Sequence, residues 1–329
     1  GFESTAHYAL NLELFLENAH HSFMEVNPVL IKEYKKSTTL RRTKTDSVDC
    51  ESIARWLITV EYKPHSKGFY HAYSLKSLTR LRDRLIRQRS FYLVKITNVL
   101  DHTFPEFKPF FNERLSKTAL YLLENYGSAE KMARMNSASY DKLRCISRGK
   151  FSIQQFLRLK ELAANTVGVN NSIFDLELNT LLTLYKSLSD EINTLETEII
   201  KLIEEVHPHY MSIPGIGPIS SAVIYAEYGD ISNFSNPGQM LAFAGIEPGI
   251  NDSGTESHGG RMVKHGSSQL RYVLLNACLP LIRFDLTFAT YYEKKRAEGK
   301  KHRVAITHVA KKLIRVIYAL ERQDVDFNA

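Results

Sequence analysis

The chain has 329 residues, which is too long for one compact core and predicts two or three domains. Its composition, 43% hydrophobic and 24% charged, is that of an ordinary globular protein. No run of 18 apolar residues predicts a membrane span, so we expect a cytoplasmic protein with no membrane partner. The cysteines, Cys50, Cys145 and Cys278, are far apart and fit neither a zinc site nor a disulfide framework, as in a reducing compartment.

The net charge of +7 is moderate, so the grouping of basic residues says more than their number. Three short basic stretches occur, and the third lies at residues 294–303. The first includes Lys35, Lys36, Arg41, Arg42 and Lys44, and the second includes Arg80, Arg84 and Arg87. Each stretch alone could be a solvated face, but three of them beside other signals favour a polyanionic partner.

The first elements fit the later part of an α/β domain. Residues 5–19 predict an amphipathic helix with Leu10, Leu14 and Phe15 on one side, and residues 21–26 predict a short strand. A second helix is expected to start near Thr45, which can cap it. The strands that would normally precede these elements are not expected in this chain.

The middle of the chain reads as helical. Residues 74–100 predict a long basic helix, and residues 112–170 predict helices without recognisable chemistry. From Leu178 to Val206, apolar residues recur at alternating spacings of three and four, which predicts a coiled coil of about four heptads. Its partner is either the 74–100 helix or another subunit. One long helix against a globular core remains an alternative.

Residues 209–329 predict a domain that is all-helical apart from a Gly-rich loop at 245–266. Pro214, Gly215, Ile216 and Gly217 predict a helix-hairpin-helix turn, because glycines allow a tight turn and a close approach. The next helix would present free N–H groups, which suit a DNA phosphate. A turn without a ligand is the alternative, and the pattern recurs weakly at 234–246.

Carboxylates near Thr45 suggest a metal site. Asp46 and Asp49 lie three apart on one face of a helix start and could bind a divalent cation, although acidic residues favour helix N-termini for electrostatic reasons alone. Glu3 adds a third carboxylate from another element. A cluster that holds two magnesium ions for phosphoryl transfer needs at least three carboxylates, usually from separate elements. These three come from only two elements, so the metal site is plausible but incomplete.

Several motifs resemble, in order, one protein family. The N-terminal ones are Glu3-Ser4-Thr5-x-His7-Tyr8, Val26-Asn27-Pro28 and Lys44-Thr45-Asp46-x-x-Asp49. The C-terminal ones are Ile213-Pro214-Gly215-Ile216-Gly217, Ala244-Gly245-Ile246-x-Pro248, Ser253-Gly254, Lys264-x-Gly266 and Leu270-Arg271. Together they resemble the RuvC-like DEDD transposases of bacterial insertion sequences, which include Piv-like pilin-gene invertases and bridge-RNA-guided recombinases.

The resemblance implies a site made of two parts. Glu3, Asp46 and Asp49 would be the second, third and fourth acids of an RNase H-like Mg²⁺ site, and the first aspartate has no counterpart here. Ser253 would be the nucleophile. Apart from the resemblance, His258, Arg261 and Lys264 lie near Ser253 in the sequence and could contact a DNA phosphate, although they could equally be ordinary basic loop residues; Arg271 is a further candidate DNA contact. The family also implies homo-oligomers, dimers or tetramers, joined through a coiled coil, and a structured guide RNA for some members.

The sequence therefore predicts three regions. Residues 1–108 would form a truncated RNase H-like (RuvC-like) α/β domain with the long basic helix, residues 109–208 a helical coiled-coil region, and residues 209–329 an all-α transposase domain. The predicted function is that of a transposase or site-specific DNA recombinase. The alternatives are a metal-dependent nuclease or junction resolvase without a covalent intermediate, and a catalytically dead nucleic-acid-binding remnant.

Overall fold

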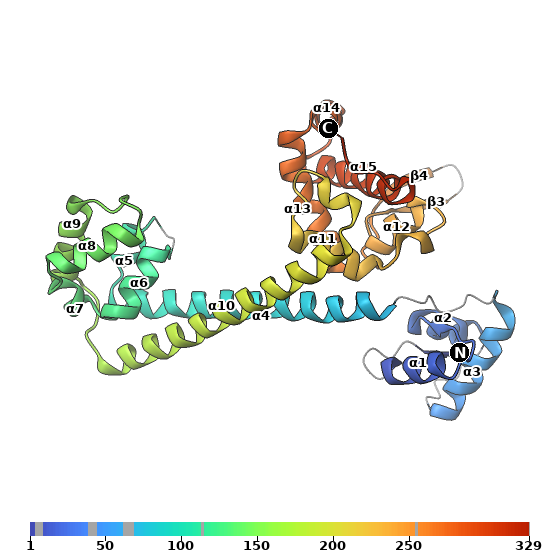
Figure 1. Ribbon diagram of the computed structural model, residues 1–329, viewed down its shortest axis with the longest axis horizontal. Helices are drawn as coiled ribbons and strands as arrows, with labels where there is room; N and C mark the ends of the chain where they lie inside the picture. The colour runs from blue at the N-terminus through green and yellow to red at the C-terminus, as the bar shows by residue number, and fades with distance from the viewer. Residues whose placement is uncertain (4–8, 39–44, 62–68, 113–114, 254–255, 329) are drawn as a thin grey trace. The chain divides into compact units, whose positions relative to one another are not determined.

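The computed structural model describes residues 1–3, 9–38, 45–61, 69–112, 115–253 and 256–328 (Figure 1). Side chains are described in these ranges except at 69–71 and 248–261. The chain divides into two compact units, Gly1–Phe69 and Tyr70–Ala329. The three predicted regions, with boundaries after residues 108 and 208, stay a prediction.

The first unit is a small α/β element. Its parts in chain order are β1 (Phe2–Glu3), α1 (Ala9–Asn18), β2 (Glu25–Val26), α2 (Pro28–Thr38) and α3 (Asp46–Thr59). The two strands pair in parallel, with Phe2 opposite Glu25, and parallel strands need a crossover such as α1. The predicted helix start is confirmed, because Thr45 accepts a hydrogen bond from the N–H of Val48. The larger RNase H-like fold stays a prediction.

The buried side of α1 differs from the prediction. Leu14 and Phe15 are exposed (37% and 64%), whereas Ala9 and Glu13 are buried. The helix carries apolar residues on more than one of its sides, so their spacing alone does not show which side is buried. The predicted apolar face of α1 is therefore wrong.

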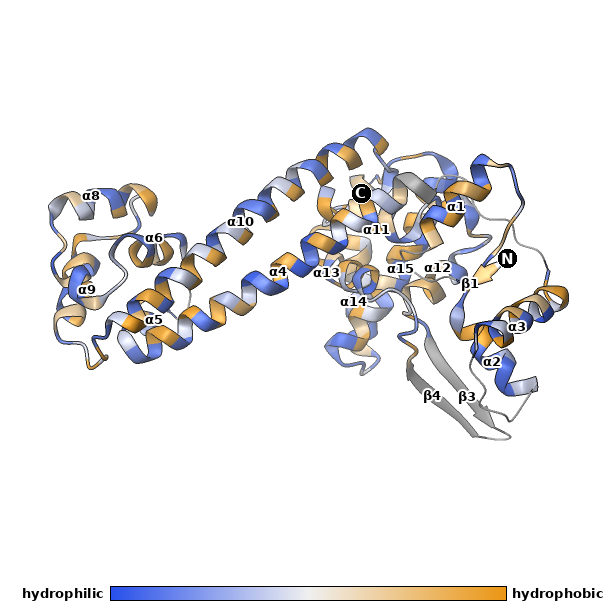
Figure 2. Cartoon of the chain, turned by 90° about the horizontal axis from the view of Figure 1, so that it is seen from below, coloured by the Kyte–Doolittle hydropathy of each residue, from blue (hydrophilic) through white to orange (hydrophobic). Residues whose placement is uncertain are grey.

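Two long helices form the arm of the second unit, α4 (Phe69–Thr103) and α10 (Ser172–Val206). They are antiparallel, because Leu75 near the start of α4 packs with Ile199 and Ile203 near the end of α10. An ion pair of 2.5 Å between Arg82 Nη2 and Glu196 Oε1 also joins them. In Figure 2, hydrophobic residues alternate along both helices with polar ones.

Parts of the predicted α10 seam pack inside the chain. Leu178 and Ile199 are buried in clusters that include α4 residues, as the intrachain alternative expects. Pairing of α10 with another subunit as a coiled coil stays a prediction.

A helical lobe occupies the chain between α4 and α10. Its helices are α5 (Phe107–Phe110), α6 (Lys117–Tyr126), α7 (Ala129–Ala133), α8 (Ser137–Ile146) and α9 (Ile153–Ala164). Phe107, Leu122 and Leu159 are fully buried at its centre, and the ends of α4 and α10 contribute to the same core.

The C-terminal part is mostly helical. Its elements are η2 (His209–Ser212), α11 (Pro218–Tyr228), η3 (Ile231–Asn233), α12 (Pro237–Ala244), β3 (Pro248–Ser253), β4 (Glu256–Met262), α13 (Ser268–Phe284), α14 (Leu286–Ala297) and α15 (His302–Gln323). The core centres on α13 and α15, where Leu274, Leu281, Leu313 and Ile317 are fully buried.

No single helix in the described ranges is long and apolar enough to cross a membrane. The adjoining helices α13 and α14 reach the required length and composition only when counted together, across a 106° bend.

The Gly-rich segment at 245–266 is not the loop that the sequence predicts. It contains the antiparallel pair β3 and β4, with Ser253 opposite Glu256 and an irregularity between Pro248 and Ile250. The ladder uses backbone N–H and C=O groups, so it forms without the apolar alternation that signals a strand. The prediction of an all-α C-terminal domain is therefore wrong at this hairpin.

Two glycines fix the base of the β-hairpin formed by β3 and β4. A Cβ on Gly266 would lie 2.0 Å from the carbonyl oxygen of Phe243, and one on Gly245 would lie 2.7 Å from the backbone nitrogen of Gly266. The N–H of Val263 also donates to the carbonyl of Glu247 at 2.9 Å. These contacts set where the hairpin leaves the helical core.

We expect Gly266→Ala to destabilise the protein by about 1–3 kcal/mol, because the new methyl group must displace backbone. The matched control is Gly217→Ala, whose Cβ meets nothing within 4 Å and whose φ of −80° suits alanine. Urea unfolding measures both. Equal unfolding midpoints for the two variants would show that the crossing at Gly266 does not constrain the fold.

Candidate nucleic-acid interface and catalytic residues

The predicted metal-binding acids are only partly brought together. Asp46 and Asp49 lie in the first turn of α3, where Asp46 is exposed and Asp49 forms an ion pair with Lys35 of α2. Glu3 is half-buried at the end of β1. In the part of the chain that the structure describes, no group of three His, Cys, Asp or Glu residues is placed to hold a metal. The donors suit a hard cation, but the described geometry supports no reaction step through one.

The first basic stretch is partly engaged in ion pairs. Lys35 pairs with Asp49, and Lys36 pairs with Glu33 at 2.6 Å. The other predicted contacts in this stretch, Arg41, Arg42 and Lys44, lie outside the described residues.

Glu13 is a titratable group that sequence reasoning missed. It is 2% exposed on α1, and its Oε2 has no hydrogen-bond partner among the described groups. Burial, and then the negative charges of Glu25 and Glu17, raise the pKa of its carboxyl to about 7. Nothing in the apolar segment around it signals this burial.

The predicted hairpin at Pro214 is present, with one difference. Its first helix is the short 3₁₀ turn η2 and not an α-helix, because His207 adopts a left-handed conformation and Pro208 follows it. Ile213 and Ile216 are buried and anchor the turn.

The two glycines of the hairpin have different roles. Gly215 has a φ of +97°, and a Cβ there would lie 2.5 Å from Cγ of Pro280, so this glycine serves packing against α13. Gly217 faces open space and precedes α11, which has no side-chain cap and begins with Pro218. Pro218 has no N–H, so the groups that remain available to an anion are the N–H groups of Ile219 and Ser220.

The weaker repeat at α12 differs in this respect. Pro237 again begins the helix, but the side chain of Asn236 accepts a hydrogen bond of 3.1 Å from the N–H of Gln239. Part of the anion-binding capacity of this helix start is satisfied internally.

The predicted nucleophile lies on the β-hairpin. Ser253 ends β3, but its side chain and those of His258 and Arg261 are outside what the structure describes. Lys264, beyond β4, is exposed. Arg271 is half-buried and donates to the carbonyl of Ala244 at 3.2 Å, which gives it a structural contact alongside its predicted role.

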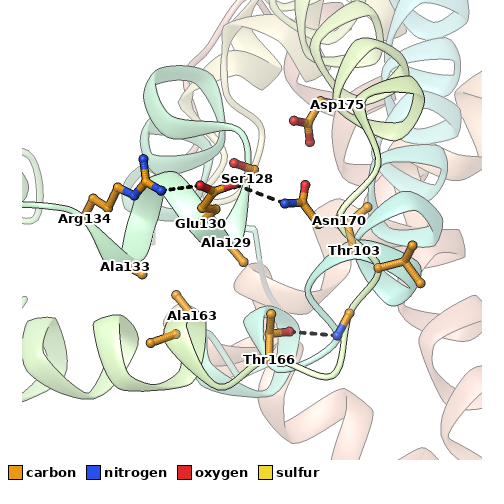
Figure 3. A pocket seen from close by; sticks show the side chains of 13 residues that line it. Thr103, Ser128, Ala129, Glu130, Ala133, Arg134, Ala163, Thr166, Asn170 and Asp175 are labelled. Atoms are coloured by element: carbon orange, nitrogen blue, oxygen red, sulfur yellow. Dashed lines mark hydrogen bonds and ion pairs between the residues drawn. The ribbon is translucent and has the colours of Figure 1, made fainter.

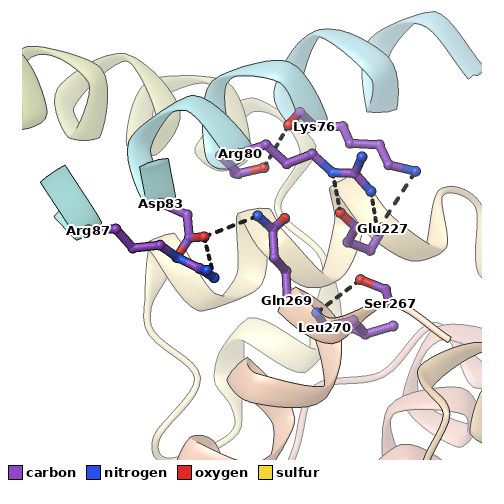
Figure 4. Close-up of polar contacts among 9 residues, drawn as sticks. Lys76, Arg80, Asp83, Arg87, Glu227, Ser267, Gln269 and Leu270 are labelled. Atoms are coloured by element: carbon purple, nitrogen blue, oxygen red, sulfur yellow. Dashed lines mark hydrogen bonds and ion pairs between the residues drawn. The ribbon is translucent and has the colours of Figure 1, made fainter. Parts of the chain in front are cut away.

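The basic face of α4 is held against α11 (Figure 4). The guanidinium of Arg80 donates to both carboxylate oxygens of Glu227, at 3.0 and 3.2 Å, and Lys76 lies 3.7 Å from the same group. The Glu227 side chain is 2% exposed. Arg87 pairs with Asp83 at 2.9 Å, and Arg84 has no ion-pair partner in the described ranges.

A separate cavity of about 380 Å³ lies in the helical lobe (Figure 3). Its central carboxylate, Glu130, bonds Arg134 at 2.5 Å and Asn170 at 3.1 Å. Because these polar groups pair with one another, the cavity offers no evident chemistry.

Comparison with known proteins gives two family matches. Residues 1–105 match the IS110-type DEDD transposase family, and residues 208–293 match the transposase family of IS116, IS110 and IS902. The chain belongs to the IS110-type insertion-element transposases. The segment 106–207, which contains the lobe and all of α10, lies outside both matches.

Similar curated proteins agree with this family. The IS110 insertion-element protein of Streptomyces coelicolor is 28% identical over 237 residues, which are 69% of this chain and 58% of that protein. The IS900 protein of Mycobacterium paratuberculosis is 28% identical, over 85% of this chain and 71% of its own length. The pilin gene-inverting protein of Moraxella bovis is 27% identical over 43% of this chain and 46% of its own.

In this family member, η2 is tied to the segment after α15. His209 contacts Asp326 and Asp324 through its two ring nitrogens, each at 2.9 Å, and Ser212 Oγ accepts a hydrogen bond of 2.8 Å from the N–H of Phe327. The hydrogen bond to Asp326, then that to Asp324, raises the pKa of His209. This clasp holds the element that enters the hairpin.

We expect the clasp to weaken as pH rises. A histidine whose folded pKa is raised contributes stability that is fully present below its unfolded pKa, near 6.5, and is lost as pH passes the folded pKa. Urea unfolding of the wild type should therefore show a contribution that fades above about pH 6.5. His209→Gln should remove this component, and an unchanged pH profile in the variant would exclude it.

Proposed function

We propose that this chain acts as the transposase or site-specific recombinase of an insertion sequence, cutting and rejoining DNA. The observation that carries the proposal is the pair of family matches, one over the DEDD segment and one over the hairpin segment. The chain spans 58% of the length of the Streptomyces coelicolor relative. The activity of a whole insertion-element protein is therefore part of this proposal.

The hairpin at Pro214–Gly217 is proposed to bind the DNA backbone. Support comes from its open surface at Gly217 and from the uncapped start of α11. Backbone N–H groups at a helix start bind phosphate oxygens without reading bases. Such contacts position DNA and leave sequence choice to other parts of the system.

Ser253 is proposed as the nucleophile, with Arg261, Lys264 and Arg271 as further DNA contacts. Its hydroxyl oxygen would form a bond to a backbone phosphorus while the bond from phosphorus to one strand's oxygen breaks, and its proton would pass to a base. The product is a phosphoserine link and a free strand hydroxyl. Because the link keeps the energy of the broken bond, the reverse attack rejoins strands without ATP.

Glu3, Asp46 and Asp49 are proposed to bind Mg²⁺, as the DEDD family implies. When bound, such an ion stabilises charge that develops on phosphate oxygens. This chain supports the proposal with oxygen donors of the right type and with two carboxylates in one helical turn. The RNase H-like (RuvC-like) fold of this region belongs to the same proposal.

The proposed partners are DNA, a structured guide RNA and further copies of the chain. The basic stretches support a nucleic-acid partner. Oligomerisation through α10 is supported by apolar side chains on its surface, because Ile173 and Leu176 are 69% and 68% exposed.

The nucleophile is tested by Ser253→Ala. We expect the variant to lose covalent protein–DNA adducts on DNA that carries the element's ends, while its DNA affinity stays within about twofold, because only a hydroxyl is removed. Adducts are measured by denaturing gel after a short incubation with Mg²⁺. The matched control is Ser137→Ala, which removes an exposed hydroxyl at the start of α8 in the lobe.

Two outcomes would contradict the serine chemistry. Undiminished adducts in Ser253→Ala would exclude this residue as the nucleophile. Cleavage without an adduct in the wild type, abolished by EDTA, would instead favour a metal-dependent nuclease.

The hairpin is tested by Gly217→Ala. The added methyl group leaves the fold unchanged but stands where a phosphate would approach, so we expect affinity for random-sequence duplex DNA to fall about threefold to tenfold. Fluorescence anisotropy at several salt concentrations measures this loss. Wild-type affinity in the variant would show that this turn does not contact DNA.

A further inference from the structure

A pocket of about 410 Å³ lies between α4 and the start of α13. It is lined by Arg80, Arg84, Arg87, Ser267, Ser268 and Gln269. All six residues lie in the second compact unit, and none of them belongs to the turn at Pro214–Gly217. We call it the α4–α13 pocket.

The charge in this pocket is not balanced. Its three arginines face two carboxylates, Glu227 and Asp83, and Glu227 is shared with Lys76. Arg84 is exposed and has no ion-pair partner in the described part of the chain. The surplus positive charge is carried by arginine side chains that line one cavity. An anion bound there would therefore lower the electrostatic energy of the pocket.

The start of α13 adds donors to the same space. Ser267 caps this 17-residue helix by accepting a hydrogen bond of 3.2 Å from the N–H of Leu270. The cap does not reach the two N–H groups before Leu270, those of Ser268 and Gln269, which have no intrahelical acceptor. Gln269 is held in place because its amide nitrogen donates to Asp83 at 3.4 Å (Figure 4).

The Glu227 contacts explain how the pocket keeps its shape. Arg80 is fixed by two hydrogen bonds to a buried carboxylate, so the α4 face is held beside α11 and α13 without any ligand. Arg84 lies one helical turn beyond Arg80 on the same face of α4. It is thus presented by a rigid support, and binding needs little further ordering of backbone.

We propose that the α4–α13 pocket binds a backbone phosphate of a nucleic acid, with Arg84 and the first N–H groups of α13 as its main ligands. The inference rests on the proposed function and adds a second phosphate contact, separate from the hairpin. The ligand chemistry is a phosphodiester, which duplex DNA and structured RNA share.

Arg84→Gln tests the pocket, because it removes a charge without breaking an ion pair. The matched control is Arg158→Gln, which removes an exposed arginine from α9 in the lobe. The probes are a labelled random-sequence DNA duplex and an RNA duplex of equal length, titrated over a range of salt. We expect about threefold to tenfold weaker binding and a salt slope lower by about 1 in Arg84→Gln alone.

A second variant tests the helix start. Ser268→Pro removes one N–H at the first helical position, where proline is compatible with a helix, and should weaken binding without lowering the unfolding midpoint. Its control is Ile153→Pro at the first position of α9.

The outcomes separate the two proposals. Loss of affinity on the DNA duplex alone or on the RNA duplex alone supports the pocket and identifies the source of its phosphate. Equal affinities of Arg84→Gln and Arg158→Gln on both probes would overturn the pocket, while a loss in Gly217→Ala would leave the proposed function standing.

Discussion

The buried carboxylate of Glu227 organises the second unit. It lies near the end of α11, the helix that follows the turn at Pro214–Gly217. Its carboxylate contacts Arg80 and Lys76 of α4, which precede it by about 150 residues in the chain. A buried carboxylate without partners would cost several kcal/mol, so the position of α4 and the burial of Glu227 depend on each other. The nearby packing of Leu75 with Ala222 and Ala226 reinforces the same junction.

This junction decides which cations are available to a ligand. Arg80 and Arg82 are engaged with Glu227 and Glu196, so they hold helices together. Arg84 forms no such ion pair in the described part of the chain. A basic helix therefore divides its charge between support and recognition, and a count of arginines in the sequence does not distinguish the two.

The sequence predicted the elements that rest on local chemistry. Thr45 before an acidic turn marked the start of α3, and the Pro-Gly-Ile-Gly turn marked the start of α11. It failed where tertiary context decides. Pairing of β3 with β4 uses backbone groups that leave no apolar pattern, and the burial of Glu13 depends on partners elsewhere in the fold. Likewise, helix spacing predicts that Asp46 and Asp49 lie close together in one turn, but it says nothing about where Glu3 lies, because Glu3 belongs to a separate element.

The lobe between α4 and α10 has a consequence for how this chain tolerates change. The chain enters the lobe from one long helix and returns along the other, which are joined by the Arg82–Glu196 ion pair and by the packing of Leu75 on Ile199. A chain cut within the lobe would thus still be held together at the far end of the arm. Because the two helices of the arm are held together away from the lobe, extra sequence can be inserted in the lobe while the junction at Glu227 remains intact.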